Sequence, residues 1–209
     1  EIFEDVVYRD IISRYDLSDE TNLKTLARFA ISNVGNLISY NSIGKSMDLD
    51  KNTVKKYLQA FQNTYTLFLV KKYDYSLKKQ IVNPKKVYCI DNGLADSVSF
   101  KFSQNLGRLL ENLVFIDLLR RNYDIFYHKK KKECDFVLQE KDRVTRSIQV
   151  CYDLNDKNRK REIGGLKEAM KEFNIKEGLI LTYDQEDEIK FKKKKIKIKP
   201  VWKWLLDIN

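Results

Sequence analysis

The sequence predicts a mixed α/β fold, and two patterns carry that prediction. Residues 2–63 place apolar side chains three or four positions apart, which is typical of amphipathic helices. Residues 103–207 alternate helical and strand-like segments, which is typical of helices packed on a mixed sheet. With 209 residues, of which 43% are hydrophobic, the chain is long enough for one domain or two small ones with buried cores.

The first 63 residues predict four helices. The first covers residues 2–15, and Asp16 or Asp19 can cap the second, which ends at Gly35. A short helix, a turn at 48–50 and a helix over 51–63 follow. The last helix has one apolar face, formed by Val54, Tyr57, Leu58 and Phe61.

Two strands are expected next, at 67–73 and 86–90, with a basic segment between them at 76–80. This order of elements is typical of a winged helix-turn-helix: a helix, a short helix, a turn, a helix and a hairpin. The second helix of such a unit can lie in the major groove of DNA. Lysines would then neutralise phosphates. The candidate DNA contacts are Lys51, Lys55, Lys56, Lys78 and Lys79. Such a unit can equally bind protein, and exposed lysines are often only solvated, so both readings stay open.

The second half carries most of the basic excess, with 28 Lys and Arg against 20 Asp and Glu in residues 84–209. A long helix is expected over 103–121 and another over 157–173, although Gly164 and Gly165 weaken the prediction in its middle. The expected strands are 125–128, 134–139, 146–152, 177–182 and 195–199, and the last helix is 200–207. Alternating Lys and Ile over 195–199 predict an edge strand protected by charge.

Three polar residues in this half suggest a catalytic site. Glu111 lies inside an apolar helix, Asp135 begins a strand, and Gln149 lies in the next strand. A helical acid followed by polar residues on two neighbouring strands is the order of the PD-(D/E)XK nuclease site. There, oxygen ligands hold Mg²⁺, which polarises the phosphate and activates water. Glu111 and Asp135 are therefore the candidate Mg²⁺ ligands.

Several segments together resemble the C-terminal region of prokaryotic AAA-type ATPases. They are YRDI (8–11), VYCIDNGL (87–94), GRLLENLVF (107–115), KECDFV (132–137) and IQVCY (148–152). In that family an N-terminal ATPase core precedes a winged helix and a PD-(D/E)XK nuclease-like domain. The resemblance implies a helical connection to a missing ATPase core at 1–20, a winged helix-turn-helix at 21–90 and a restriction-endonuclease-like domain at 91–209. It also implies that ATP binds only through the missing core, which becomes an intramolecular partner, and that an oligomer can form.

The chain departs from the active nuclease pattern at two positions. Gln149 replaces an anionic ligand, and Cys151 stands where the pattern has a Lys that assists the nucleophile. Lys157 could substitute for it only by geometry that the sequence does not give. We therefore expect a module that binds DNA or a partner and has a degenerate nuclease-like site. Two alternatives remain: a Mg²⁺-dependent DNA phosphodiesterase, and a protein–protein or oligomerisation module.

Other functions are disfavoured by the sequence. Gly44-Lys45-Ser46 has the ending of a Walker A loop, but Ser39 stands where its first Gly belongs, so we expect no ATP binding at Lys45. Three cysteines without CxxC spacing indicate free thiols in a reducing cytosol. The longest apolar runs are far below the roughly 20 residues that span a bilayer, and no secretory signal is visible. A cytoplasmic protein without a membrane partner is expected.

Overall fold

The computed structural model describes Ile11, residues 19–98 and residues 105–207. This part of the chain holds eight helices and nine strands, which confirms the mixed α/β class. The helix expected over 2–15 lies outside the described residues except for Ile11, and so does most of the expected connection at 1–20. The chain divides into two compact units. The first is Glu1–Val70 with Ile81–Asn112, and the second is Lys71–Gln80 with Leu113–Asn209.

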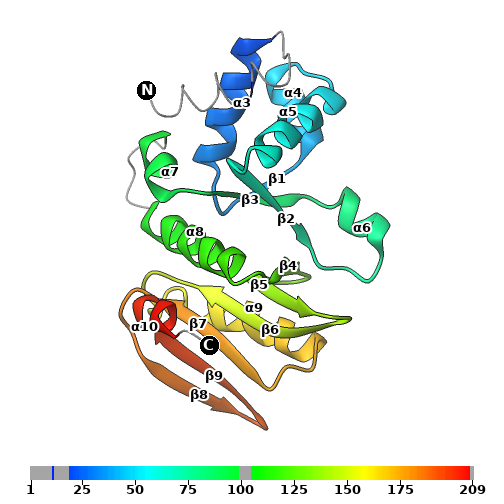
Figure 1. The fold of residues 1–209 in the computed structure, drawn as a ribbon. Helices are drawn as coiled ribbons and strands as arrows, with labels where there is room; N and C mark the ends of the chain where they lie inside the picture. The colour runs from blue at the N-terminus through cyan, green and yellow to red at the C-terminus, as the bar shows by residue number, and fades with distance from the viewer. Residues whose placement is uncertain (1–10, 12–18, 99–104, 208–209) are drawn as a thin grey trace. The chain divides into compact units, whose positions relative to one another are not determined.

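The first unit is mainly helical (Figure 1). Its elements are α3 (Glu20–Ser32), β1 (Leu37–Ile38), α4 (Tyr40–Met47), α5 (Lys51–Asn63), most of β2 (Leu67–Lys72), β3 (Lys85–Cys89), α7 (Asn92–Val98) and the first half of α8 (Asn105–Arg120). Asp19, rather than Asp16, caps α3, because its Oδ1 accepts a hydrogen bond from Asn22 N at 3.1 Å. The core of the unit joins α3, α4 and α5 through fully buried side chains such as Leu26, Val54 and Phe61.

Strand β3 lies between β1 and β2 in this unit, and it pairs antiparallel with β1. The connection from β2 to β3 differs from the simple hairpin loop that the sequence predicted, because it contains a short helix, α6 (Leu77–Val82). Asp74 precedes this helix and contacts its first turn. Its Oδ1 accepts from Ser76 N at 2.9 Å, and its carbonyl oxygen accepts from Gln80 Nε2 at 2.7 Å.

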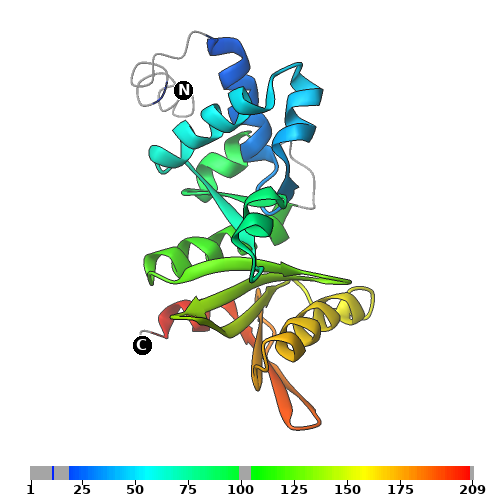
Figure 2. The ribbon, with the colours of Figure 1, turned by 90° about the vertical axis from the view of Figure 1, so that its right-hand side faces the viewer.

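The second unit contains six whole strands in the order β4-β5-β6-β7-β9-β8, and the last two residues of β2, Lys71 and Lys72, pair in parallel with β4. The strands are β4 (Asp124–Lys129), β5 (Glu133–Glu140), β6 (Arg143–Val150), β7 (Glu177–Thr182), β8 (Asp187–Phe191) and β9 (Lys194–Pro200). Strands β4, β5 and β6 form an antiparallel meander, whereas β6–β7 and β7–β9 pair in parallel. Helix α9 (Arg159–Glu172) makes the parallel crossover and packs on β5, β6 and β7 (Figure 2).

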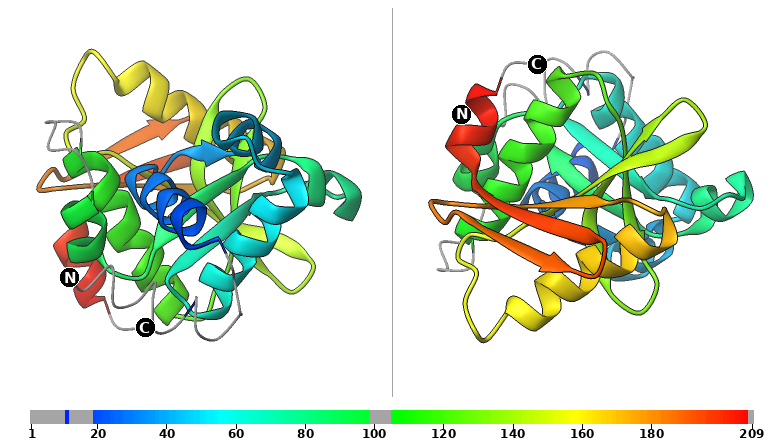
Figure 3. Two further views of the ribbon diagram at one scale, coloured as in Figure 1. Left: turned by 90° about the horizontal axis from the view of Figure 1, so that it is seen from above. Right: turned by 90° about the horizontal axis from the view of Figure 1, so that it is seen from below.

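Helix α9 is continuous through the glycine pair that weakened its prediction, because one of these glycines is needed for packing. A Cβ atom added at Gly165 would overlap the backbone carbonyl oxygen of Glu133 on β5. The helix backbone therefore lies directly against the sheet, with Leu166 and Met170 fully buried beside it. Helix α10 (Val201–Leu206) follows β9 and ends the described chain (Figure 3).

The prediction that 195–199 form an edge strand was wrong. Strand β9 lies between β7 and β8, and β8 occupies the edge. The lysines of β9 are explained by acids on its neighbours: Lys195 and Lys197 pair with Glu177 of β7 at 2.9 and 2.8 Å. A charged alternating strand is therefore compatible with an interior position when the adjacent strand carries the opposite charge.

Candidate functional site

The helix-turn-helix of the first unit has a tight turn between α4 and α5. Asp48 adopts a left-handed conformation (φ 53°), and Leu49 N donates to Gly44 O at 2.9 Å. A Cβ atom at Gly44 would lie 2.6 Å from Leu49 O, so the turn requires glycine there. Asp50 Oδ1 then caps α5 by accepting from Asn52 N at 2.7 Å. Residues 44–46 belong to helix α4 and form no phosphate-binding loop.

The polar side of α5 carries the predicted DNA contacts. Because Val54, Leu58 and Phe61 bury the opposite face, Lys51, Lys55 and Lys56 are exposed. None of the three lysines has an ion pair within the described part of the chain. Lys45 on α4 is also exposed. This surface therefore presents cations whose charge is not neutralised by neighbouring acids.

Several lysines near the C-terminus differ from those of α5, because acids pair with them. Lys190 pairs with Glu188 at 3.4 Å, and Lys199 and Lys203 pair with Asp207 and Glu186. The segment over 190–199 thus offers fewer free cations than its composition suggests. Lys78 and Lys79 are exposed on α6, but they belong to the second unit. Their placement beside α5 as a wing stays a prediction.

Glu111 of α8 lies in the first unit, where side chains of β3 contact it. Lys86 Nζ lies 3.0 Å from Glu111 Oε1, and Tyr88 Oη donates to the same oxygen at 2.6 Å. The Lys86 side chain is only 2% exposed. Sequence reasoning missed Lys86 because lysine side chains are rarely buried, whereas Lys85 and Lys86 are both buried in β3.

The neighbouring Asn112 holds α8 to β3. Its Oδ1 accepts from Cys89 N and its Nδ2 donates to Cys89 O, both at 2.9 Å. The Nδ2 group also donates to Asn92 Oδ1 at 2.8 Å. The Glu-Asn pair of the 107–115 segment therefore makes specific polar contacts with the strand that precedes it in the chain.

Asp135 and Gln149 meet in the second unit, as their neighbouring strands predicted. Asp135 N donates to Gln149 Oε1 at 3.3 Å, and Asp135 Oδ2 accepts from Val150 N at 2.9 Å. Both residues are about 5% exposed. Whether Glu111 lies beside them stays a prediction, since Glu111 belongs to the other unit.

The structure adds a carboxylate that sequence reasoning missed. Glu162 of α9 is 5% exposed, and its Oε2 accepts from Gln149 Nε2 at 2.7 Å. Its Oε1 accepts from the guanidinium of Arg161 at 2.6 and 2.8 Å. The sequence does contain a signal for the burial of Glu162. It lies four residues before Leu166 and seven before Ala169, so helical spacing places it on their buried face.

In the cluster formed by Asp135, Gln149, Cys151, Arg161 and Glu162, burial favours the neutral forms of Glu162 and Cys151. Burial raises the pKa of Glu162, and the charge of Asp135 raises it further, although Arg161 and Gln149 oppose the shift. Burial, followed by the charge of Glu162, raises the pKa of Cys151 to about 11. Cys151 is therefore a neutral thiol at pH 7, and its Sγ donates to Asp153 O at 3.1 Å.

The strand position that the nuclease pattern gives to a Lys holds Cys151, and the cation that pairs with this cluster is Arg161 of helix α9, through Glu162. Lys157, the other candidate, is exposed, and its backbone N donates to Asn155 Oδ1 at 3.1 Å.

Among the described residues, no group of three or more His, Cys, Asp or Glu side chains is arranged to hold a metal ion. The three cysteines are all buried and free. Within the described ranges, no helix is both long and apolar enough to cross a membrane.

Comparisons with known proteins divide the chain close to the middle. Residues 1–105 match a domain of unknown function (DUF8612), and residues 106–204 match another (DUF4143). An uncharacterized protein of Methanocaldococcus jannaschii is 34% identical and covers 99% of the chain, and one of Haemophilus influenzae is 31% identical and covers 73%. The chain spans 49% and 40% of these two relatives. No solved structure matches it.

Proposed function

We propose, for a chain that belongs to the family of the domain of unknown function DUF8612, that its helix-turn-helix binds DNA through helix α5. The observation that carries this proposal is the exposed set of Lys51, Lys55 and Lys56, which has no ion pair within the described residues. An unpaired lysine can approach a phosphate without first leaving an acid, and it releases counterions from DNA when it does so.

The architecture of the unit supports the proposal. Helix α5 follows a tight turn and buries only one face. Its polar face therefore stays accessible to the major groove of DNA. Phosphate contacts by lysine give affinity without sequence specificity. We therefore propose DNA binding with weak sequence preference through these three residues, and protein binding by the same surface is the alternative that the experiment below separates.

The wider context is also a proposal. The resemblance to the C-terminal region of AAA-type ATPases, and relatives of which the chain spans only 49% and 40%, support a role as the DNA-binding part of a cytoplasmic ATPase. The ATPase core would then be the intramolecular partner, and ATP would bind there. Assembly into an oligomer belongs to the same proposal.

The test compares two triple variants by fluorescence anisotropy with a labelled DNA duplex. Lys51→Ala, Lys55→Ala and Lys56→Ala together should weaken binding about tenfold or more. The matched control removes the same charge from lysines that are already paired with acids, namely Lys190, Lys195 and Lys197. DNA binding by this control should weaken less, because the control loses only the general contribution of net charge. Equal losses in the two triple variants would overturn the proposal.

A second candidate function, Mg²⁺-dependent phosphodiester cleavage, is favoured by one observation. Glu162 brings a second buried carboxylate close enough to Asp135 for the charge of Asp135 to raise the pKa of Glu162. Paired carboxylates are the ligands that Mg²⁺ prefers. Against this candidate, both polar ends of Gln149 are held by protein groups, since Oε1 accepts from Asp135 N and Nε2 donates to Glu162. DNA binding therefore remains the first proposal.

A further inference from the structure

The second unit contains a cavity of about 640 Å³ where strands β6 and β7 separate. Their pairing begins only at Ile148 and Leu179, so the preceding residues of β6 do not pair with β7 and line the cavity instead. A shift in the β5–β6 register between Leu138 and Gln139 bends β6 at the same place. The cavity volume lies within the range of roughly 300–1,000 Å³ that is typical of small-molecule sites.

Two buried hydroxyl groups in the cavity wall have no hydrogen-bond partner among the described residues. They are Thr145 Oγ1 and Ser147 Oγ, and Ser147 is only 1% exposed. A buried hydroxyl without a partner costs free energy, so folded proteins rarely keep one unless something else satisfies it. Two of them on one strand, in the wall of one cavity, point to a ligand with hydrogen-bonding oxygens.

The charged side chains of the cavity wall indicate the charge of that ligand. Arg143 and Lys176 line the cavity, are exposed, and have no ion pair within the described part of the chain. The acid in the wall, Glu177, is already neutralised by Lys195 and Lys197, which hold its pKa below the ordinary value against the effect of burial. The cavity is therefore complementary to an anion.

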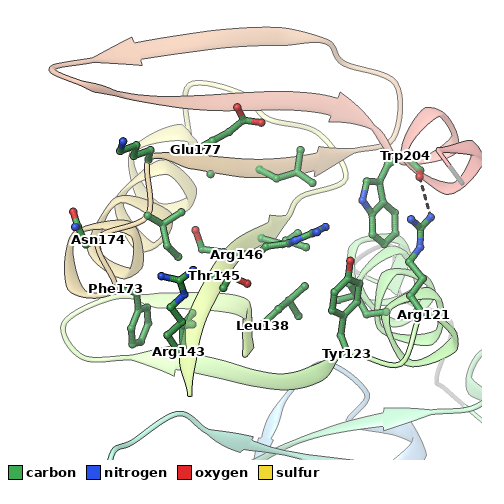
Figure 4. A pocket seen from close by; sticks show the side chains of 18 residues that line it. Arg121, Tyr123, Leu138, Arg143, Thr145, Arg146, Phe173, Asn174, Glu177 and Trp204 are labelled. Carbon is green, nitrogen blue, oxygen red and sulfur yellow. Dashed lines mark hydrogen bonds between the residues drawn. The ribbon is translucent and has the colours of Figure 1, made fainter. Parts of the chain in front are cut away.

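The cavity also has an aromatic side. Figure 4 shows Tyr123 and Trp204 at one end and Arg143 with Phe173 and Asn174 toward the other. Two arginines fix the aromatic rings: Arg146 lies 5.2 Å from the Tyr123 ring centroid, and Arg121 lies 4.8 Å from that of Trp204. Arg121 Nη2 also donates to Trp204 O at 3.2 Å, which holds that end of α10 in place.

We infer that this cavity binds a small phosphate monoester that carries a flat ring, as a nucleoside monophosphate does. The phosphate oxygens accept hydrogen bonds from Ser147, Thr145, Arg143 and Lys176. Together these residues offer more hydrogen-bond donors than a single carboxylate can accept, so a phosphate fits the site better. The ring lies toward Tyr123 and Trp204, whose aromatic faces suit stacking. This site is independent of the lysines of α5, which belong to the other unit.

Isothermal titration calorimetry of the whole chain tests the inference with three probes: adenosine monophosphate, adenosine and inorganic phosphate. We expect adenosine monophosphate to bind at least about tenfold more tightly than either fragment, since each fragment makes only part of the contacts. No binding of adenosine monophosphate would overturn the inference. Equal affinity for the monophosphate and inorganic phosphate would overturn the part that concerns the ring.

Two variants locate the site. Ser147→Ala and Arg143→Gln should each weaken binding of adenosine monophosphate by about fivefold to twentyfold. Ser147→Ala should leave the unfolding midpoint of the free protein unchanged or raised, because it removes an unpaired buried hydroxyl. Arg159→Gln is the matched control, since Arg159 is a partly exposed arginine outside the cavity that pairs with Asp187. Unchanged affinity in both cavity variants would overturn the inference.

Discussion

Gln149 Nε2 donates a hydrogen bond to Glu162 Oε2 across 2.7 Å and thereby joins strand β6 to helix α9. Gln149 Oε1 accepts from Asp135 N on the other side. The side chain that the PD-(D/E)XK pattern would use as a metal ligand is therefore a bridge between two protein groups. An amide suits this position because it offers one donor and one acceptor, whereas a carboxylate offers acceptors only.

Gln149→Glu is expected to destabilise the fold at pH 7 by about 2–4 kcal/mol, because it replaces the donor with a second buried carboxylate against Glu162. Protonation should relieve the repulsion, so the loss should shrink at low pH. Urea unfolding at several pH values measures both effects. Gln139→Glu, on half-buried Gln139 of β5, is the control. A variant as stable as the wild type at pH 7 would contradict the bridging role.

Glu162→Gln tests the raised pKa of Glu162 through the pH dependence of stability. Because the folded pKa lies above the ordinary value of 4.5, the native state favours the protonated carboxyl. That stabilisation is fully present below pH 4.5 and is lost as the pH rises through the folded pKa. The free energy of unfolding of the wild type, taken relative to Glu162→Gln, should therefore fall over that interval by up to about 1.4 kcal/mol per pH unit. A difference that stays constant would show that burial leaves this carboxyl unperturbed.

Gly44→Ala should destabilise the first unit by about 1–3 kcal/mol, since the new Cβ atom would lie 2.6 Å from Leu49 O in the helix-turn-helix. The control is Gly107→Ala in α8, where a Cβ atom meets no atom of the described residues within 4 Å. It should be neutral or stabilise by up to about 1 kcal/mol, because alanine favours the helix. Thermal unfolding of the two variants checks this, and similar midpoints would refute the tight turn.

Plasmid nicking with Mg²⁺ or Mn²⁺ is expected to be absent in the wild-type chain. Cys151 carries no positive charge at pH 7, and Gln149 is held away from a metal by its hydrogen bonds. The double variant Gln149→Glu and Cys151→Lys should raise the affinity for Mg²⁺ if the site is only damaged. Cleavage by the wild type that disappears in Asp135→Ala would place phosphodiester cleavage ahead of DNA binding.

Local patterns predicted the helices and strands well where one face is buried. Helix α5 covers the expected 51–63, and β7 covers the expected 177–182, because their apolar residues follow the period of the element. Strand β8 was missed, since none of its five side chains is buried and the periodic signal is absent. Helix α6 was missed for the same reason.

The candidate site was predicted only in part because its contacts depend on tertiary structure. Asp135 and Gln149 lie on neighbouring strands, so their pairing follows from a hairpin. Lys86 is 25 residues from Glu111, and Glu162 is 13 residues from Gln149. No local pattern specifies which distant residue satisfies a buried charge. Whether Glu111 approaches Asp135 stays a prediction for the same reason.

The salt dependence of DNA binding tests the central proposal most directly. If Lys51, Lys55 and Lys56 each contact one phosphate, the slope of log K against log salt should differ by about 2.7 between the wild type and the triple alanine variant. That difference corresponds to about 40-fold in affinity over a fourfold change in salt. Anisotropy titrations at several salt concentrations measure it. We expect a shallower slope in the variant; parallel slopes for the two proteins would contradict DNA binding by helix α5.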